Sequence, residues 1–355
     1  MPTEISDWND LDNVRNDLTG DYVLVNDLDS ETDGYGGIGD DFEPIGFIED
    51  EEFTSEFAGS FDGDGFSISD LVIEYDGLDR GDIALFASTD TGALIENLSV
   101  AGSVTVTNSG VFCCAGLVGV INGGTIQNCV SHVDVTSDGD AVGGLVGDNR
   151  DTVTESYATG SVEGDSDVGG LVGQNRDTLT NSYATGSVEG SSNVGGLVGL
   201  NTGNTLTESY ATGSVEGDSD VGGLVGNSFG EEIDSYWDTE ATGQSTSDGG
   251  TGLTTAEMQG SEAETNMDGF DFADVWDSVL ESDDDTSEDG YPILLAVDRE
   301  EQLDAQGILS LIAFTISALV NSESVEIQDI FAQVDGEVKQ VTEASALIDG
   351  SVEQI

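Results

Sequence analysis

Carboxylates are the most abundant chemically active groups in this sequence. The 355 residues include 73 Asp and Glu, six Lys and Arg and one His, which gives a formal net charge of -67 at pH 7. With so many acids, some pair will always lie at the separation that a glycosidase needs, so such a pair has no diagnostic value here. A polysaccharide lyase would also need a basic residue beside the acids. Arg150 and Arg176 occupy equivalent positions of a sequence repeat, which indicates a repeated surface feature instead.

The single histidine and the three cysteines complete no catalytic or metal-binding set. Ser131 adjoins His132 in an extended segment, so their side chains should point to opposite faces. Cys113 and Cys114 are adjacent and cannot bridge each other without strain, whereas a bridge from either one to Cys129 remains open. A tetrahedral metal site would need more ligands. The sequence contains no P-loop, no GxGxxG segment that starts a helix and no HExxH motif. We therefore assign no catalytic, cofactor-binding or metal residues and expect a protein that is not an enzyme.

The acidic segment 281–290 is the one candidate for a structural cation such as calcium. Its sequence lacks the EF-hand spacing and the bidentate glutamate of that motif. A solvated loop is the favoured interpretation, and calcium is the alternative.

The acids are scattered among Gly, Val, Leu and Ile instead of forming one acidic tail. Self-repulsion at this charge destabilises a compact state at low ionic strength, and abundant salt would screen it. The sequence contains a single lysine, Lys339. Together these features indicate a protein from a halophile. Nucleic-acid binding is excluded because no basic patch could neutralise phosphates.

A repeat between residues 141 and 226 organises the chain. The box Val-Gly-Gly-Leu-Val-Gly recurs with its leucines at steps of 26, 26 and 27 residues, at Leu145, Leu171, Leu197 and Leu224. A fixed period of this size marks a solenoid, a propeller or an array. Each repeat is rich in strand-forming residues and has no helical stripe. Two or three short strands fit one turn of a parallel β-helix, whereas a propeller blade needs about 40 residues.

Stacking of the repeats predicts several features of each coil. The box should be an extended segment, with Val168 and Val172 on one face and Leu171 on the other. We expect six or seven coils. Equivalent residues should form ladders, which stabilise stacked strands. The expected tyrosine ladder is Tyr157, Tyr183, Tyr210 and Tyr236, and the expected asparagine ladder is Asn149, Asn175 and Asn201.

The Gly-Leu-Val-Gly boxes, the segment Phe57-Ala-Gly-Ser-Phe-Asp-Gly-Asp-Gly-Phe and the segment Tyr291-Pro-Ile-Leu together resemble the GLUG-repeat proteins. This family occurs in bacterial and archaeal surface adhesins and in some surface proteases. The resemblance extends over about residues 4–296. It implies a right-handed parallel β-helix used for display or adhesion, and it carries no catalytic residue onto this chain.

The sequence predicts an all-β protein with five segments. Trp8, Leu11 and Val14 have helical spacing after the possible N-caps Ser6 and Asp7. The last residues repeat with a period of 14 around Asp-Gly turns, which predicts β-hairpins. The segments are an N-terminal cap of a short helix plus a strand (1–56), the GLUG-type solenoid (57–238), a second cap (239–296), a linker (297–313) and three 14-residue hairpin repeats (314–355).

The second cap should contain a capped helical turn that starts at Thr254, and it should cover the last coil. Its apolar residues suited to that role are Phe270, Phe272, Val275 and Trp276. The hairpins have little core of their own, so they should mediate oligomerisation, for example as a trimer, or docking to other virion or surface-assembly proteins.

No secretory signal is recognisable, and the longest apolar run, 307–320, is too short to span a bilayer as a helix. We expect a virion surface or an extracellular cell-surface location in high salt. Recurring positions such as Glu155, Asn181 and Glu208, and the Thr-Gly-Ser corners, could bind a polymer multivalently. The predicted function is attachment to a host surface glycan or surface-layer glycoprotein, as a tail-fibre or spike component of a haloarchaeal virion. The alternatives are a secreted haloarchaeal adhesin, a purely structural decoration or spacer and, less favoured, a polysaccharide depolymerase.

Overall fold

The computed structural model describes residues 1–46, 56–76, 81–107, 110, 112–203, 205–278 and 290–296, and the backbone of four short strands between 331 and 354. The contacts divide the chain into two units, Met1–Val297 and Asp298–Ile355. Each unit is described by itself.

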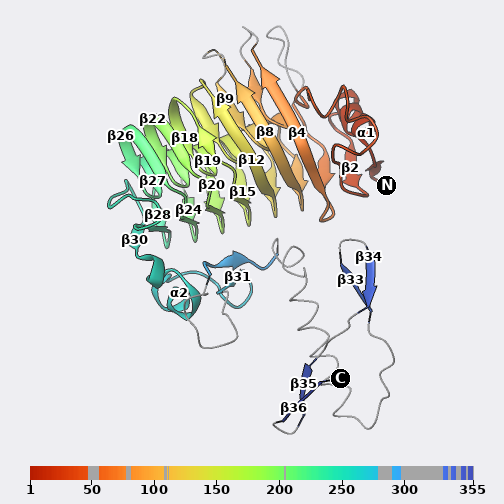
Figure 1. Cartoon of the computed structure of the whole chain (residues 1–355). Coiled ribbons are helices and arrows are strands. Elements are labelled where there is room, and N and C mark those ends of the chain that lie inside the picture. Colours follow the sequence, from red (N-terminus) through yellow and green to blue (C-terminus); the bar gives the residue numbers. More distant parts are fainter. Residues whose placement is uncertain are drawn as a thin grey trace. The chain divides into compact units, whose positions relative to one another are not determined.

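The first unit is a parallel β-solenoid in which each coil adds one rung to three sheets (Figure 1). The first of these, sheet C, has six strands, so the repeat makes about six coils, as the sequence predicts. Each of its strands begins within a Gly-Leu-Val-Gly box or its degenerate equivalent. In spatial order they are β6 (Phe86–Thr89), β10 (Val118–Ile121), β14 (Val146–Asn149), β19 (Val172–Asn175), β23 (Val198–Asn201) and β27 (Val225–Ser228).

Sheet A follows sheet C in each coil, and the N-terminal cap extends it by two strands. Its short Thr-apolar-Thr strands alternate, with the apolar residue buried in the core. Its nine strands are β1 (Thr3–Ile5), β2 (Asp21–Leu24), β3 (Ser60–Asp62), β7 (Leu94–Glu96), β11 (Thr125–Gln127), β15 (Thr152–Thr154), β20 (Thr178–Thr180), β24 (Thr205–Thr207) and β28 (Glu232–Ile233).

Sheet B is the broadest, and its long strands β4, β8 and β12 lie side by side in Figure 1. In register, Val188 lies beside Val162 on one side and Val215 on the other. The strands are β4 (Ser67–Tyr75), β5 (Asp82–Ile83), β8 (Ser99–Val106), β9 (Cys113–Ala115), β12 (Val130–Ser137), β13 (Ala141–Gly143), β16 (Tyr157–Ala158), β17 (Val162–Glu163), β18 (Ser166–Gly169), β21 (Tyr183–Ala184), β22 (Val188–Gly195), β25 (Tyr210–Ala211), β26 (Val215–Gly222), β29 (Tyr236–Asp238) and β30 (Thr251–Leu253).

The Val-Gly-Gly-Leu-Val-Gly box is a corner, so the prediction of one alternating strand was wrong. β18 ends at Gly169 and β19 begins at Val172, and Val168, Leu171 and Val172 are all 0% exposed in the same core. A turn between the two strands brings both of them to face inward. Gly170 permits this turn, since a Cβ there would lie 2.2 Å from the Gly196 carbonyl oxygen of the next coil.

The predicted asparagine ladder is confirmed inside the coils. Asn149 Nδ2 donates to Asn175 Oδ1 at 2.8 Å, and Asn175 Nδ2 donates to Asn201 Oδ1 at 3.0 Å. All three residues are 0% exposed. The ladder ends on Glu232, whose carboxylate accepts from Asn201 Nδ2 at 2.6 Å. The side chains therefore satisfy one another from coil to coil, as buried amides must.

A buried serine ladder was missed in the sequence. Ser182 Oγ donates to the Thr180 carbonyl at 2.8 Å and accepts the Ser156 backbone N–H of the preceding coil at 3.3 Å. The residue before each serine adopts a left-handed conformation, and a backbone hydrogen bond between coils is lost there. The serine hydroxyl replaces that hydrogen bond. The ladder comprises Ser156, Ser182, Ser209 and Ser235.

The short helix predicted for the N-terminal segment is present. Helix α1 (Trp8–Asn13) begins at the N-cap Asp7, whose Oδ1 accepts the Asp10 N–H at 2.9 Å. A 3₁₀ turn, η1 (Val14–Asn16), follows. Trp8, Leu11 and Val14 are 0% exposed and join the solenoid core.

The segment after the solenoid contains η2 (Thr255–Glu257), α2 (Gly260–Asn266) and the antiparallel pair β31 (Trp276–Asp277) and β32 (Ile293–Leu294). Thr254 and Glu257 form the predicted capping box. The role predicted for its aromatic residues was only partly right. Phe270 and Trp276 pack along the outer tyrosine ladder and reach Tyr183 and Tyr210, well before the last coil.

Trp237 closes the core of the last coil. It takes the register position that Ala184 and Ala211 hold in the preceding coils, and it belongs to the core cluster. Its indole Nε1 donates to the Gln244 carbonyl at 3.0 Å. A large ring therefore fills the space that the next coil would otherwise occupy.

The second unit contains two antiparallel hairpins, in agreement with the predicted 14-residue hairpins. They are β33 (Phe331–Val334) with β34 (Glu337–Gln340), and β35 (Ser345–Ile348) with β36 (Ser351–Gln354). The first expected hairpin, the linker 297–313 and the acidic segment 281–289 lie outside the described residues. Within the described part of the chain, no helix is long and apolar enough to cross a bilayer.

Candidate functional site

The outer face of sheet B presents the same polar groups in successive coils. Along one coil, Ala184 and Val188 point into the core, while Thr185, Ser187 and Glu189 point outward and are exposed. The alternation follows from the two-residue period of an extended chain. We call this surface the Thr-Ser-Glu face. It comprises Thr159, Ser161, Glu163, Thr185, Ser187, Glu189, Thr212, Ser214 and Glu216.

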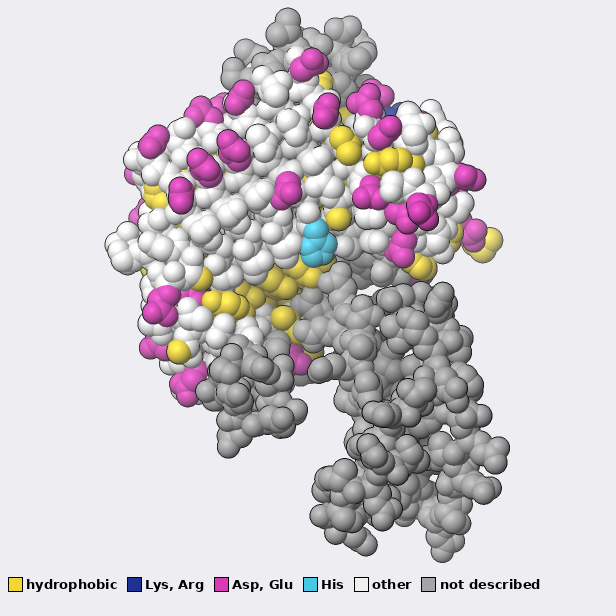
Figure 2. Space-filling model, in the orientation of Figure 1, with side chains coloured by type: hydrophobic (Ala, Val, Ile, Leu, Met, Phe, Trp, Pro, Cys, Tyr) yellow, Lys and Arg dark blue, Asp and Glu magenta, His cyan; other side chains and the backbone are white. Residues whose placement is uncertain are grey.

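The register of sheet B aligns these groups in columns. Glu163 lies beside Glu189, and Glu189 lies beside Glu216. The preceding coil continues the face with different residues: His132 Nδ1 lies 2.6 Å from Thr159 Oγ1, and Asp134 accepts from Ser161 Oγ at 2.7 Å. Figure 2 shows this side of the solenoid, with Asp and Glu side chains spread above the histidine and a hydrophobic stripe along the lower margin.

The predicted tyrosine ladder points outward, away from the core of the coils. The rings of Tyr157 and Tyr183 stack at 4.5 Å with an interplanar angle of 9°, and those of Tyr183 and Tyr210 at 4.9 Å with 4°. The segment 251–296 covers the ladder, and Tyr210 Oη donates to the Pro292 carbonyl at 2.6 Å. The aromatic column is therefore buried, and the exposed face next to it is polar.

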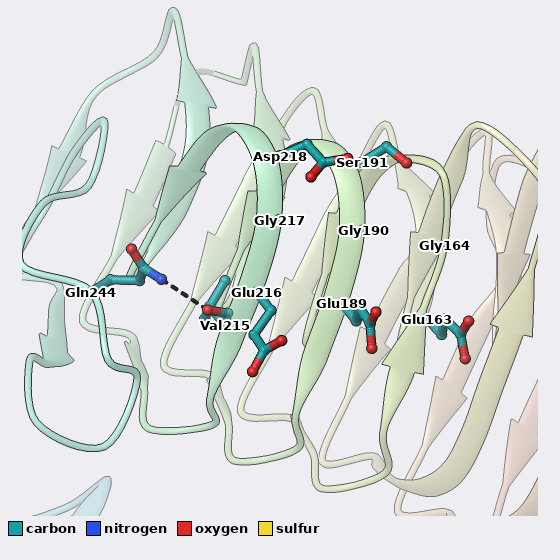
Figure 3. Close-up of a pocket in the computed structure, with 10 residues that line it drawn as sticks. All are labelled: Glu163, Gly164, Glu189, Gly190, Ser191, Val215, Glu216, Gly217, Asp218 and Gln244. Carbon is teal, nitrogen blue, oxygen red and sulfur yellow. Dashed lines mark hydrogen bonds between the residues drawn. The ribbon is translucent and has the colours of Figure 1, made fainter.

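A groove of about 560 Å³ runs across three coils at the glutamate column. We call it the crease (Figure 3). At Gly190 a Cβ would lie 2.8 Å from Val168 Cγ2, so the backbone there approaches the core more closely than any other residue would allow. Gly164 and Gly217 occupy the equivalent positions. The crease is lined by Glu163, Gly164, Glu189, Gly190, Ser191, Val215, Glu216, Gly217, Asp218 and Gln244.

The polar side chains that line the crease are four carboxylates, one hydroxyl and one amide. Figure 3 shows the three glutamates in a row along one wall, with Ser191 and Asp218 at the other. Gln244 Nε2 donates to the Val215 carbonyl at 2.8 Å and closes the end of the row. The lining contains no lysine or arginine. The crease can therefore accept hydrogen bonds from several hydroxyl or amino donors at once.

The two arginines of the repeat do not contribute to this face. Arg150 and Arg176 both bind Asp148, at 2.7 and 2.8 Å, and the Asp148 side chain is 2% exposed. Arg150 also donates to Asn122 Oδ1 at 2.6 Å. Their equivalent sequence positions thus produce a clamp between neighbouring coils instead of a repeated ligand contact.

Ser131 and His132 point to opposite faces, as expected. Ser131 Oγ is buried and donates to the Gly144 carbonyl at 2.6 Å, whereas the His132 ring lies on the outer face beside Thr159. A Ser-His nucleophile is not formed at this position.

The three cysteines are free and buried. Burial raises the pKa of Cys114 and of Cys129 to about 12, and burial together with the nearby Asp82 raises the pKa of Cys113 well above its usual value. Thiols of this kind are poor nucleophiles because little thiolate is present near neutral pH. Within the described residues, no group of three or more His, Cys, Asp and Glu is arranged to hold a metal ion.

The recurring residues Glu155, Asn181 and Glu208 lie elsewhere than predicted. Each is only partly exposed and adopts a left-handed conformation at a coil corner, with φ of 46°, 48° and 51°. Burial, together with Asp234, raises the pKa of Glu208. The Thr-Gly-Ser segments, in contrast, place their serines on the exposed face as expected. The sequence period predicted that both sets of residues recur from coil to coil. It could not show which set lies at a coil corner and which lies on the exposed face of sheet B.

The coil that builds this face corresponds to a known motif. The family described as the GLUG motif matches residues 164–189 and 190–216. Each match starts at a crease glycine and ends at the next glutamate of the column. The solenoid is a GLUG-repeat β-helix. The prediction made from the Gly-Leu-Val-Gly boxes is confirmed.

A relative of the GLUG-repeat chain comes from a halophilic archaeon. Over 165 residues the chain is 34% identical to halomucin of Haloquadratum walsbyi. The matched stretch makes up 44% of this chain and 2% of halomucin. The match agrees with the halophilic character read from the charge.

The fold is also found in a solved structure. A crystal structure from Bacteroides ovatus, of a candidate immunoglobulin A1 protease, superposes with a TM-score of 0.62 at 20% identity. The superposition covers 83% of this chain and 92% of the other. At this identity the likeness concerns the fold alone.

Proposed function

We propose that this GLUG-repeat protein is a non-enzymatic, adhesin-like protein that binds host or cell-surface glycan or glycoprotein in a high-salt environment. The observation that carries the proposal is the Thr-Ser-Glu face. Three successive coils present the same hydroxyls and carboxylates in register, and the serines and glutamates among them are exposed. A repetitive ligand can contact equivalent groups at each coil, so weak contacts add through effective concentration.

The chemistry of the described residues supports binding over catalysis. The thiols are buried, Ser131 and His132 face opposite ways, and both repeat arginines are engaged with Asp148. The acids that remain exposed are numerous and alike, which suits recognition better than a single pair with distinct acid and base roles. The alternative function is that of a depolymerase, which would release sugar products from host glycan.

The setting of the protein is the second part of the proposal. Halomucin belongs to a cellular organism, which favours display at a cell surface. A virion tail fibre or spike that uses the C-terminal hairpins for assembly, as an oligomer, is the other setting. Fractionation of a producing culture distinguishes the two, because the protein should accumulate either with surface-layer material or with purified virus particles.

The binding test uses the purified full chain in molar KCl. Immobilised protein should retain surface-layer glycoprotein and whole haloarchaeal cells, and it should release no reducing ends or unsaturated sugars from them. Retention should fall when Thr185, Ser187 and Glu189 are replaced together by Ala, whereas replacement of Glu4 in β1, exposed outside this face, should have no effect. Absence of retention with wild-type protein would leave a structural spacer as the better description.

A further inference from the structure

We infer that the crease is a lengthwise binding subsite for a polyhydroxylated polymer without anionic groups, which lies parallel to the solenoid axis. The inference rests on the proposed function and specifies the ligand class at that site. Four observations carry it: the direction of the crease, its repeat distance, its lining and the conditions under which it must work.

The direction follows from the register. The crease crosses strands of three coils at equivalent residues, so it runs along the solenoid axis and not along a strand. Gly164, Gly190 and Gly217 bring the backbone close to core valines in each coil, which keeps the groove continuous. A linear polymer fits such a groove lengthwise, whereas a compact ligand would contact one coil only.

The repeat distance is that of the coils. The stacked tyrosine rings on the same sheet are 4.5 and 4.9 Å apart, which measures the advance per coil. This advance is close to the length of one pyranose ring in an extended polysaccharide. Successive sugars can therefore meet Glu163, Glu189 and Glu216 in the same way.

The lining selects against acidic polymers. A uronate or sulfate in the crease would approach the carboxylates of Glu189 and Glu216 without any lysine or arginine in the lining to compensate. In molar salt the screening length is about 3 Å, so long-range attraction is lost and contact hydrogen bonds decide the affinity. Sugar hydroxyls donate charge-assisted hydrogen bonds to carboxylates at contact distance. Ser191 and Asp218 offer further partners from the opposite wall.

The experiment compares three soluble hexasaccharides with the full chain in molar KCl by isothermal titration calorimetry. One is a neutral β-linked glucose hexamer, one is its amino-sugar counterpart, and one is a uronate hexamer. We expect the neutral and amino hexamers to bind and the uronate hexamer to bind at least about tenfold more weakly. Dimers of the same sugars should bind more weakly than hexamers because they reach fewer coils.

Two variants locate the binding. Glu189→Gln should weaken binding of the neutral hexamer about tenfold, as expected for the loss of one charge-assisted hydrogen bond. Glu4→Gln should leave this affinity unchanged. Gly190→Ala should also weaken it, because the added Cβ must push the strand away from Val168 and so fill the crease. Circular dichroism in the same salt checks that each variant keeps its β-structure.

The outcomes separate the inference from the proposed function. Equal or tighter binding of the uronate hexamer, or unchanged binding by Glu189→Gln, overturns the assignment of the crease. Retention of cells or surface-layer material without binding of any hexamer overturns the assignment too but keeps the adhesin-like function. If the protein binds no hexamer and retains neither cells nor surface-layer material, both the assignment of the crease and the adhesin-like function are refuted.

Discussion

Replacement of Asn175 by Ala tests whether the buried asparagine ladder holds the coils together. Asn175 makes three side-chain hydrogen bonds: it accepts from Asn149 at 2.8 Å, donates to Asn201 at 3.0 Å and donates to the Asp177 carbonyl at 3.3 Å. Its neighbours retain other partners, since Asn149 Nδ2 also reaches the Thr178 carbonyl at 2.9 Å. The loss is therefore the net value of three hydrogen bonds, about 2–4 kcal/mol, without the larger cost of orphaned groups.

The assay is urea unfolding in molar KCl, followed by intrinsic fluorescence. Urea is preferred to guanidinium because guanidinium is itself a salt and would change the screening of the acidic surface. The free energy of unfolding should fall by about 2–4 kcal/mol for Asn175→Ala and by less than about 0.5 kcal/mol for Ser187→Ala, an exposed position in the same coil. Amide exchange should accelerate first in the neighbouring coils, because a solenoid is stabilised by nearest-neighbour contacts. If both variants lose the same small amount, the ladder does not stabilise the stack.

Three further perturbations have defined outcomes. Asp148→Asn removes the shared anion of Arg150 and Arg176 and should lower the free energy of unfolding by about 1–3 kcal/mol, with exposed Asp138→Asn as the neutral control in the same urea titration. Burial raises the pKa of Asp82 from 3.8 to about 6. The favourable contribution of its protonated carboxyl to the free energy of unfolding is therefore complete below pH 3.8 and is lost as the pH rises through about 6. Asp82→Asn should therefore raise stability at pH 7 by up to about 3 kcal/mol and flatten the dependence between pH 4 and 7; an unchanged pH profile contradicts this. Lowering the salt from about 1 M to about 0.1 M lengthens the screening distance from about 3 to 10 Å and should lower the melting temperature measured by circular dichroism, whereas a constant value argues against halophilic adaptation.

The sequence was sufficient to predict the stacking and much of the capping. A period that repeats Leu, Tyr and Asn at fixed steps brings like residues together in any parallel solenoid, so the ladders followed from numbering alone. The helix caps could be predicted for a similar reason. Asp7 and the pair Thr254 and Glu257 form hydrogen bonds with backbone groups only a few residues away. Local chemistry of this kind needs no knowledge of the fold.

The placement of individual side chains required the tertiary structure. Val168 and Leu171 both face the core because the chain turns between them, and a one-dimensional alternation cannot reveal where a coil bends. Glu155 and Glu163 are similar acids in the same repeat, yet the first is held at a left-handed corner and the second is exposed in the crease. The difference follows from their places in the coil, because Glu155 lies at the turn between β15 and β16 whereas Glu163 is the outward-facing residue of β17.

The sequence by itself therefore determined the repeat unit, the coil number and the acidic surface that suits high salt. Only the tertiary structure decided that the tyrosine column is covered by residues 251–296, that the repeat arginines share Asp148, and that the Thr-Ser-Glu face remains accessible to solvent. The physical reason is that a repeat fixes which residues stack along the axis, whereas the bends within a coil and the segments packed against it fix which of those stacks meets solvent.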